Sequence, residues 1–193
     1  KIFEKILKDH VLNHLLENTL LSAYQHGFRP GHSCLTNLLT VLNCWTQALD
    51  EGFTIDKIYL DFSKAFDKVP HSRLLVKLEA YGIDGPLLNL IKNFLDGRRQ
   101  RVVVNGEYSD WINVLSGVPQ GTVFASLLFL IYANDLPDII TSIASMFADD
   151  TKLYRILRTI ATHYQLQGDL DTLVEWGKKW NMIFNIDKCS VLH

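Results

Sequence analysis

The residues best suited to chemistry are aspartates at two places far apart in the sequence. Asp149 and Asp150 are adjacent, and apolar residues flank them at 146–147 and 153–154, a pattern that predicts strand, tight turn, strand. Asp61 interrupts a second apolar run, residues 58–62, which also has strong strand preference. We therefore expect carboxylates at the ends of two separate strands.

A carboxylate in or near a buried strand is costly unless it is paired, hydrogen-bonded or bound to a cation. Asp61, Asp149 and Asp150 are thus candidates for one cluster of hard oxygen ligands. Such a cluster suits Mg²⁺, and two such ions stabilise the attacking and leaving oxygens in phosphoryl transfer. For the adjacent pair alone, an ordinary Asp-Asp turn is an equally good interpretation.

Three other polar residues lie in segments that favour a ligand. Arg29 lies between Gly27 and Gly31 and is either a phosphate clamp or a surface arginine. The loop over residues 116–121 has little side-chain bulk and offers the amide of Gln120. Lys188 lies in a predicted turn and could reach a phosphate or donate a proton, or be a plain turn lysine.

Basic residues cluster at Arg98-Arg-Gln-Arg101, just before a hairpin signal over 101–111 with the Asn105-Gly106 turn. The cluster could contact nucleic-acid phosphates or serve as a solubilising loop. His10 and His14 lie one helical turn apart, but no third ligand accompanies them, so a solvated helix face is the better interpretation.

Composition fits one globular domain: 193 residues, 48% hydrophobic, with a net charge of −2. This charge is not the strongly basic balance of a typical nucleic-acid binder. Three cysteines are too few for a disulfide framework, which fits an intracellular setting. The longest apolar run, residues 123–133, is shorter than a membrane span and predicts a core helix.

The remaining patterns predict an α+β fold. Helices are expected over 2–16, 33–49, 70–82, 86–97, 122–134 and 159–179, and two short strands around residues 185–188.

Five motifs, in their order along the chain, resemble motifs of the reverse transcriptases of non-LTR (LINE-type) retrotransposons. They are Gly27-Phe-Arg-Pro-Gly31, Tyr59-Leu-Asp-Phe-Ser-Lys-Ala-Phe-Asp67, Ser116-Gly-Val-Pro-Gln-Gly121, Phe147-Ala-Asp-Asp150 and Phe184-Asn-Ile-Asp-Lys188. The likeness is greatest for the jockey-like and chicken-repeat-like lineages. It covers nearly the whole chain.

The resemblance implies a right-hand polymerase fingers–palm fold with a small antiparallel palm sheet backed by helices. Residues 1–55 would be mostly fingers, and residues 56–193 the palm with interleaved fingers segments. We expect the primer grip, the thumb and the endonuclease to lie outside this chain.

The resemblance also implies roles for individual residues. Asp61 and Asp149 would hold two Mg²⁺ ions, with Mn²⁺ as a possible substitute, and Asp150 would assist. Lys188 would protonate the pyrophosphate, and the ring of Phe66 would exclude a 2′-hydroxyl. The nucleotide-binding set would be Arg29, Phe62, Phe66, Gln120 and Gly121, and the template- or primer-binding set Gly117, Pro119, Arg99 and Arg101.

The implied partners are an RNA template, a DNA primer and dNTPs, in the cytoplasm and nucleus and without a membrane. One departure from the family pattern is Thr122-Val-Phe-Ala-Ser126, where the family has Ser-Val-Leu-Gly-Pro; another is Ala133, where the family favours a larger aliphatic residue. Two alternatives remain: a catalytically inactive remnant or domesticated nucleic-acid-binding module, and a metal-dependent phosphohydrolase or nuclease.

Overall fold

A four-stranded antiparallel sheet forms the centre of the fold. The computed structural model describes residues 1–192, without the side chains at 160, 161 and 163. The strand order is β6 (Ile143–Phe147), β7 (Asp150–Leu157), β1 (Thr54–Leu60) and β8 (Ser190–Leu192). β1 and β7 pair along their full lengths, from Thr54 opposite Leu157 to Leu60 opposite Thr151. This register brings the end of β1 beside the beginning of β7.

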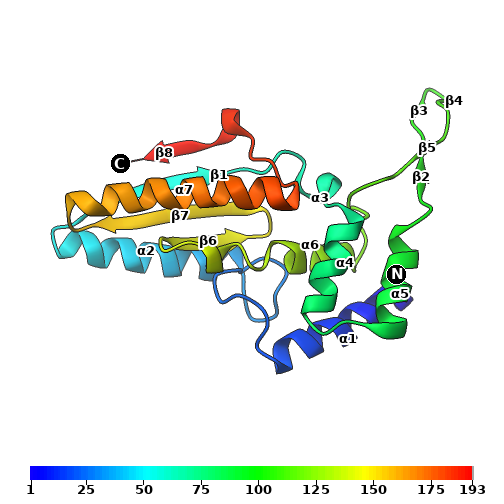
Figure 1. Cartoon of the computed structure of the whole chain (residues 1–193), viewed down its shortest axis with the longest axis horizontal. Coiled ribbons are helices and arrows are strands. Elements are labelled where there is room, and N and C mark those ends of the chain that lie inside the picture. Colours follow the sequence, from blue (N-terminus) through cyan, green and yellow to red (C-terminus); the bar gives the residue numbers. More distant parts are fainter. Residues whose placement is uncertain (193) are drawn as a thin grey trace.

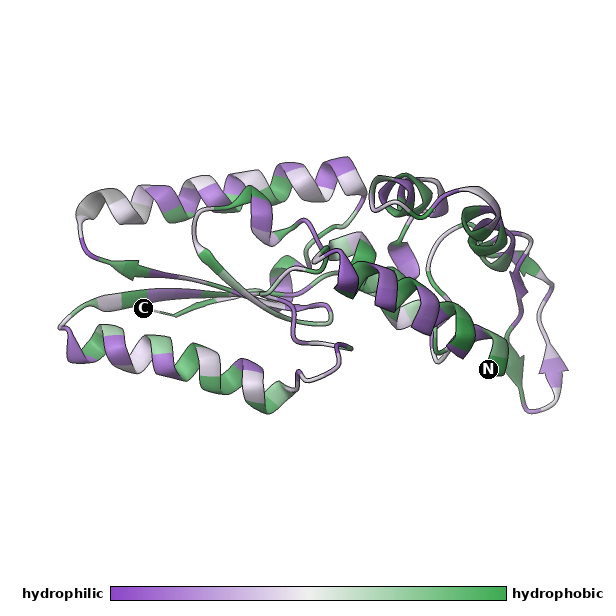
Figure 2. Cartoon of the chain, turned by 90° about the horizontal axis from the view of Figure 1, so that it is seen from below, coloured by the Kyte–Doolittle hydropathy of each residue, from purple (hydrophilic) through white to green (hydrophobic). Residues whose placement is uncertain are grey.

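Two long helices cover the opposite faces of this sheet (Figures 1 and 2), α7 (Ile160–Trp180) and α2 (Cys34–Asp50). Side chains alternate between the two faces of a strand. Ile58 and Leu153 accordingly join the main core with α7, whereas Ile55 and Tyr154 pack under α2. The sheet is therefore the middle layer of a mixed α and β fold, as the sequence predicts.

The apolar stripe of α2 faces outward. Its buried positions are Asn37, Val41 and Ala48, while its leucines remain solvent-accessible, although their three- and four-residue spacing is that of a core-facing stripe. The exposed leucines are Leu35, Leu38, Leu39, Leu42 and Leu49. Apolar periodicity thus located the helix but not the face that packs on the sheet.

The other helices pack around α6 (Ala125–Ala133), in which every residue except Ser126 is buried. They are α1 (Ile2–Glu17), α3 (Ala65–Lys68), α4 (His71–Ala80), α5 (Gly85–Leu95) and the 3-10 segment η1 (Pro137–Ile139). The predicted core helix is confirmed. No helix within residues 1–192 is both long and apolar enough to cross a membrane.

A narrow two-part hairpin projects from this helical half (Figure 1). β2 (Arg99–Gln100) pairs with β5 (Ile112–Asn113), and β3 (Val103–Val104) pairs with β4 (Glu107–Tyr108). Asn105 and Gly106 both have positive φ, at 51° and 86°, as the predicted two-residue turn requires.

Two short strands are predicted on either side of a turn at residues 185–188; within residues 1–192 the turn and the second strand are present, and the first strand is not. Residues 186–188 form the 3-10 segment η2 (Ile186–Lys188), and Phe184 makes only an isolated bridge with Phe62. β8 is the one strand that follows, and it pairs with β1. The turn before β8 is held by two backbone hydrogen bonds, in which the amides of Lys188 and Cys189 both donate to the carbonyl of Asn185.

A buried lysine ties three of these helices together. Lys77 of α4 is 4% exposed and donates to the carbonyl of Tyr132 and, at 2.5 Å, to Asp135. Its ammonium lies over three rings, the nearest being Trp180 at 4.1 Å from the ring centre, and desolvation by burial lowers its pKa to about 8 despite Asp135. Burial of this charge therefore costs free energy at neutral pH.

This cost gives the fold a pH dependence. Because the pKa of Lys77 is lower in the folded chain than in the unfolded one, the unfolded chain binds more protons, and stability rises with pH. We expect the free energy of unfolding to increase by about 1 kcal/mol from about pH 8 to pH 9.5. Above that range the raised pKa values of Tyr81 and Tyr132 act in the opposite direction.

Lys77→Met should abolish this increase, and the exposed Lys92→Met should retain it. Urea unfolding followed by circular dichroism at each pH measures the effect. An equal increase in all three proteins would contradict the role of Lys77.

Candidate active site

The pairing of β1 with β7 brings the two predicted carboxylate sites together. Asp61 directly follows β1, Asp149 lies in the turn between β6 and β7, and Asp150 begins β7. Since Leu60 is opposite Thr151, the residues just beyond these two positions meet at one end of the sheet. The long-range expectation from the sequence, that these three aspartates lie near one another, agrees with this register.

Asp61 has one carboxylate oxygen that lacks a hydrogen-bond donor. Its side chain is 28% exposed, yet Oδ2 is buried and has no hydrogen-bond partner. The Nζ of Lys188 lies 3.5 Å from that oxygen, which is within ion-pair range but outside hydrogen-bond geometry. The backbone is better held: the Asp61 carbonyl accepts from the amide of Asn185 at 2.7 Å.

Asp149 is in a less favourable environment for charge. Desolvation raises its pKa, and the charges of Asp150 and Asp61 raise it further, while Lys188 acts in the opposite direction. Negative charge at this end of the sheet is therefore only partly compensated by the side chains themselves. A cation bound there would relieve both the desolvation and the repulsion.

These side chains suit a divalent cation with oxygen ligands. A cavity of about 330 Å³ opens beside them, and its lining includes Asp61, Asp150 and Lys188. Within the described part of the chain, no group of three His, Cys, Asp or Glu side chains could hold a metal ion, so the predicted three-aspartate cluster is not formed as a ready metal site. Mg²⁺ takes few protein carboxylates and completes its coordination with waters and substrate phosphates, so two aspartates would be enough protein ligands for it.

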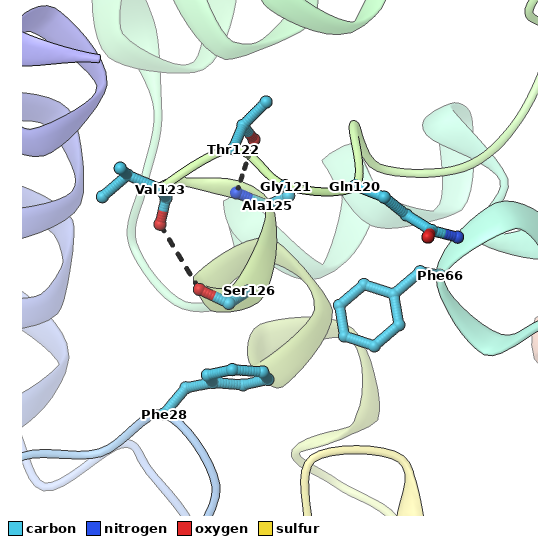
Figure 3. A pocket seen from close by; sticks show the side chains of 8 residues that line it. All are labelled: Phe28, Phe66, Gln120, Gly121, Thr122, Val123, Ala125 and Ser126. Carbon is cyan, nitrogen blue, oxygen red and sulfur yellow. Dashed lines mark hydrogen bonds between the residues drawn. The ribbon is translucent and has the colours of Figure 1, made fainter.

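A second cavity, of about 390 Å³, lies between Phe66 and the segment that leads into α6 (Figure 3). Phe66 stacks on Phe129 with ring centres 4.4 Å apart, and Phe28 meets it edge-on at 6.4 Å. Gln120 and Gly121 line the same cavity. The structure thus brings together three of the five predicted nucleotide-binding residues.

In the altered segment before α6, the hydroxyl of Thr122 accepts from the amide of Ala125 at 3.3 Å. Ser126 donates to the carbonyl of Val123. The start of the helix is therefore hydrogen-bonded without the family's Gly-Pro.

Gln120 and Gly117 are linked to the α3 segment. The side chain of Gln120 donates to Asp67 at 2.7 Å, an interaction that no pattern in the sequence indicates. Gly117 has φ of 87°, and a Cβ there would lie 2.6 Å from the carbonyl oxygen of Asp67. Glycine is therefore required at 117 for backbone packing.

The other predicted template- or primer-binding residues lie on the neighbouring surface. Arg99, Gly117 and Pro119 line a cavity of about 560 Å³. Arg101 lies over Tyr108 and Trp111, at 4.0 and 4.6 Å from the ring centres. Basic and aromatic groups thus share the exposed hairpin.

Two residues predicted to contact the nucleotide, Phe62 and Arg29, have side chains that are engaged within the protein. Phe62 is 4% exposed and stacks on Phe184 with ring centres 4.7 Å apart, so its side chain is part of the core. Arg29 donates to the backbone carbonyls of Ser22 and Gln25, and burial lowers its pKa. Its guanidinium therefore stabilises its own loop, and gripping a triphosphate would require these bonds to be exchanged.

The alternative histidine pair does not form a metal site. His14 is hydrogen-bonded through Nε2 to the carbonyl of Tyr81 at 2.8 Å, and His10 is exposed. All three cysteines are free, as the sequence analysis expects.

The raised pKa of Asp149 means that the stability of the fold depends on whether this carboxyl is ionised. Because the folded state holds this proton more tightly than the unfolded chain, ionisation of Asp149 destabilises the fold at pH values above the raised pKa. Without divalent metal near neutral pH, Asp149→Asn should raise the unfolding temperature by about 1–4 °C. The gain should disappear below about pH 4, where the wild-type carboxyl is also protonated.

Differential scanning calorimetry measures this shift, with the exposed Asp138→Asn as the matched control. A lower unfolding temperature for Asp149→Asn than for the control would contradict the conclusion that the charge of Asp149 destabilises the fold.

The sequence and the fold were compared with known proteins. Residues 1–193 match the family described as "Reverse transcriptase (RNA-dependent DNA polymerase)". The chain is 30% identical over 98% of its length to "Probable RNA-directed DNA polymerase from transposon X-element" of Drosophila melanogaster. It is 31% identical, again over 98%, to "RNA-directed DNA polymerase from mobile element jockey" of Drosophila funebris. It spans 22% of the length of each.

Among solved structures, telomerase from Candida albicans, in a complex with a fragment of telomeric RNA, has the same fold with a TM-score of 0.74. The identity is 12%, over 98% of this chain and 34% of that one. The family match over the whole sequence and the two transposon relatives agree with the resemblance drawn from the sequence. The chain therefore belongs to the reverse transcriptase family, and it is a reverse transcriptase domain of the non-LTR retrotransposon kind.

Proposed function

We propose that this chain is the fingers and palm of an RNA-directed DNA polymerase that adds deoxynucleotides to a primer annealed to an RNA template. The observation that carries the proposal is the meeting of Asp61 and Asp149 at the ends of paired strands, with negative charge that the protein leaves partly uncompensated. Residues 1–55 are assigned mostly to the fingers, and residues 56–193 to the palm with interleaved fingers segments.

The carboxylates orient the reacting groups. Asp61 and Asp149 would hold Mg²⁺, which supplies a lowered pKa for the primer hydroxyl and compensates charge on the phosphates. Asp150 is exposed at the start of β7 and is placed to assist through the same cavity. Support for Asp61 as a ligand comes from its buried oxygen without a hydrogen-bond partner.

Lys188 is the proposed proton donor to the leaving pyrophosphate. Its side chain is 66% exposed, and its ammonium lies 3.5 Å from Asp61, so it can exchange this weak ion pair for a phosphate. Phe66, Gln120 and Gly121 are the proposed nucleotide pocket, with the stacked ring of Phe66 limiting the space for a 2′-hydroxyl.

Primer extension tests this function. The purified chain would receive an RNA template, a labelled DNA primer, dNTPs and Mg²⁺. We expect template-directed extension by the wild type and a loss of about 100-fold or more in Asp149→Asn. Asp138→Asn should extend as well as the wild type.

Equal extension by Asp149→Asn would refute the catalytic assignment. A folded wild type that binds the RNA–DNA duplex without extending it would favour a nucleic-acid-binding module. Release of nucleotides without a template would favour a phosphohydrolase or nuclease.

The hairpin is the proposed contact to the template–primer backbone. Arg99 and Arg101 are exposed, and each lies over an aromatic ring of the hairpin. Charge-to-phosphate contacts release counterions, so their loss should reduce the salt dependence of binding. We expect the double variant Arg99→Gln, Arg101→Gln to bind an RNA–DNA duplex about tenfold more weakly in low salt.

Fluorescence anisotropy at several salt concentrations measures this, and the slope of log affinity against log salt should become less steep by about 1 to 2. The double variant Arg158→Gln, Lys178→Gln is the charge-matched control, since both residues are exposed and lie far along the sequence from the hairpin. If that variant weakens binding as much as the hairpin variant, the effect comes from overall charge.

A further inference from the structure

The loop between α1 and α2 pairs with the sheet just ahead of Asp149 (Figure 1). The amide of Met146 donates to the carbonyl of Tyr24, and the amide of His26 donates to the carbonyl of Met146, both at 2.9 Å. Gln25 and Met146 form a parallel bridge. The free edge of β6 is thereby covered by residues 24–26.

The side chain of Gln25 continues this contact into the turn. It is 4% exposed, and its Oε1 accepts from the amides of Ala148 at 2.9 Å and Gly27 at 2.7 Å. Its Nε2 donates to the carbonyl of Ala148 at 3.0 Å. One buried amide therefore binds both backbone polar groups of the residue that precedes Asp149.

Ala148 needs such support. Its φ is 57°, in the left-handed region that residues with a Cβ seldom adopt. Gly27 packs closely against the same residue, because a Cβ at position 27 would lie 2.2 Å from the Ala148 nitrogen. Arg29 holds the loop in turn by donating to the carbonyls of Ser22 and Gln25.

We propose that Gln25 is a positioning residue for Asp149. By fixing Ala148 in the left-handed conformation, its amide sets the direction in which the next residue presents its carboxylate beside Asp61. This inference rests on the proposed polymerase function. Because Gln25 carries no charge, its effect on the reaction comes from geometry.

Two variants test the proposal. Gln25→Met keeps the length of the side chain and removes all three hydrogen bonds. Gln25→Glu keeps an acceptor for the two amides and loses the donor to the Ala148 carbonyl. Gln167→Met, which replaces an exposed glutamine whose side chain donates to Asp171 of its own helix, is the matched control.

Three measurements are made on each protein well below its unfolding temperature. They are the hydrogen-exchange rate of the Ala148 amide, Mn²⁺ binding by electron paramagnetic resonance, and kcat and KM for dNTP in primer extension. We expect kcat to fall about 10- to 100-fold in Gln25→Met, with KM for dNTP within about twofold of the wild type. Exchange at Ala148 should be faster, and Mn²⁺ should bind more weakly.

Gln25→Glu separates geometry from charge. An added negative charge alone would strengthen Mn²⁺ binding, whereas a misdirected Asp149 weakens it, so weaker binding supports the positioning role. This variant also decides the question if Gln25→Met does not fold.

Wild-type kcat and Mn²⁺ affinity in the folded variants would overturn the positioning role and leave the proposed function intact. So would a loss of activity that follows the unfolding temperature and disappears on cooling. A wild type that neither binds Mn²⁺ nor extends a primer would overturn both proposals. If hydrogen exchange at the Ala148 amide of that wild type is nonetheless slow, Gln25 is a purely structural residue.

Discussion

Repulsion between carboxylates at one end of the sheet is the constraint on which the site depends. Asp61 and Asp149 are brought together by the register of β1 and β7, and burial makes the charge of Asp149 more costly still. The ammonium of Lys188, 3.5 Å from Asp61, offsets part of it. The large buried core around α6, and the packing of α7 and α2 on the two faces of the sheet, stabilise the fold and offset this unfavourable cluster of charge.

Much of this architecture was predictable from the sequence, because the signals are local or repeated. The hairpin turn at Asn105-Gly106 and the buried helix over residues 125–133 follow from turn chemistry and from an unbroken apolar run. The convergence of Asp61 with Asp149 was predictable for another reason: a carboxylate in a strand needs a partner, and each strand offered one.

The errors arise where tertiary packing decides between alternatives that look alike in the sequence. Phe62 and Phe66 are both aromatic residues that follow Asp61, yet one stacks in the core and the other lines a cavity. α2 presents Asn37, Val41 and Ala48 to the sheet and its leucines to the outside, and the buried Asn37 hydrogen-bonds to Ser145 and Met146 of β6. Gln25 gave no signal at all, since its three partners are backbone groups, two of them 123 residues away.

That separation has a consequence for how the chain folds. The helices form from contacts between near neighbours, but the turn that carries Asp149 reaches its final shape only when residues 24–27 meet residues 146–148. Closing so long a loop is entropically slow, and non-local pairing of this kind lengthens folding times. We therefore expect the end of the sheet that carries Asp149 to be among the last parts of the chain to form.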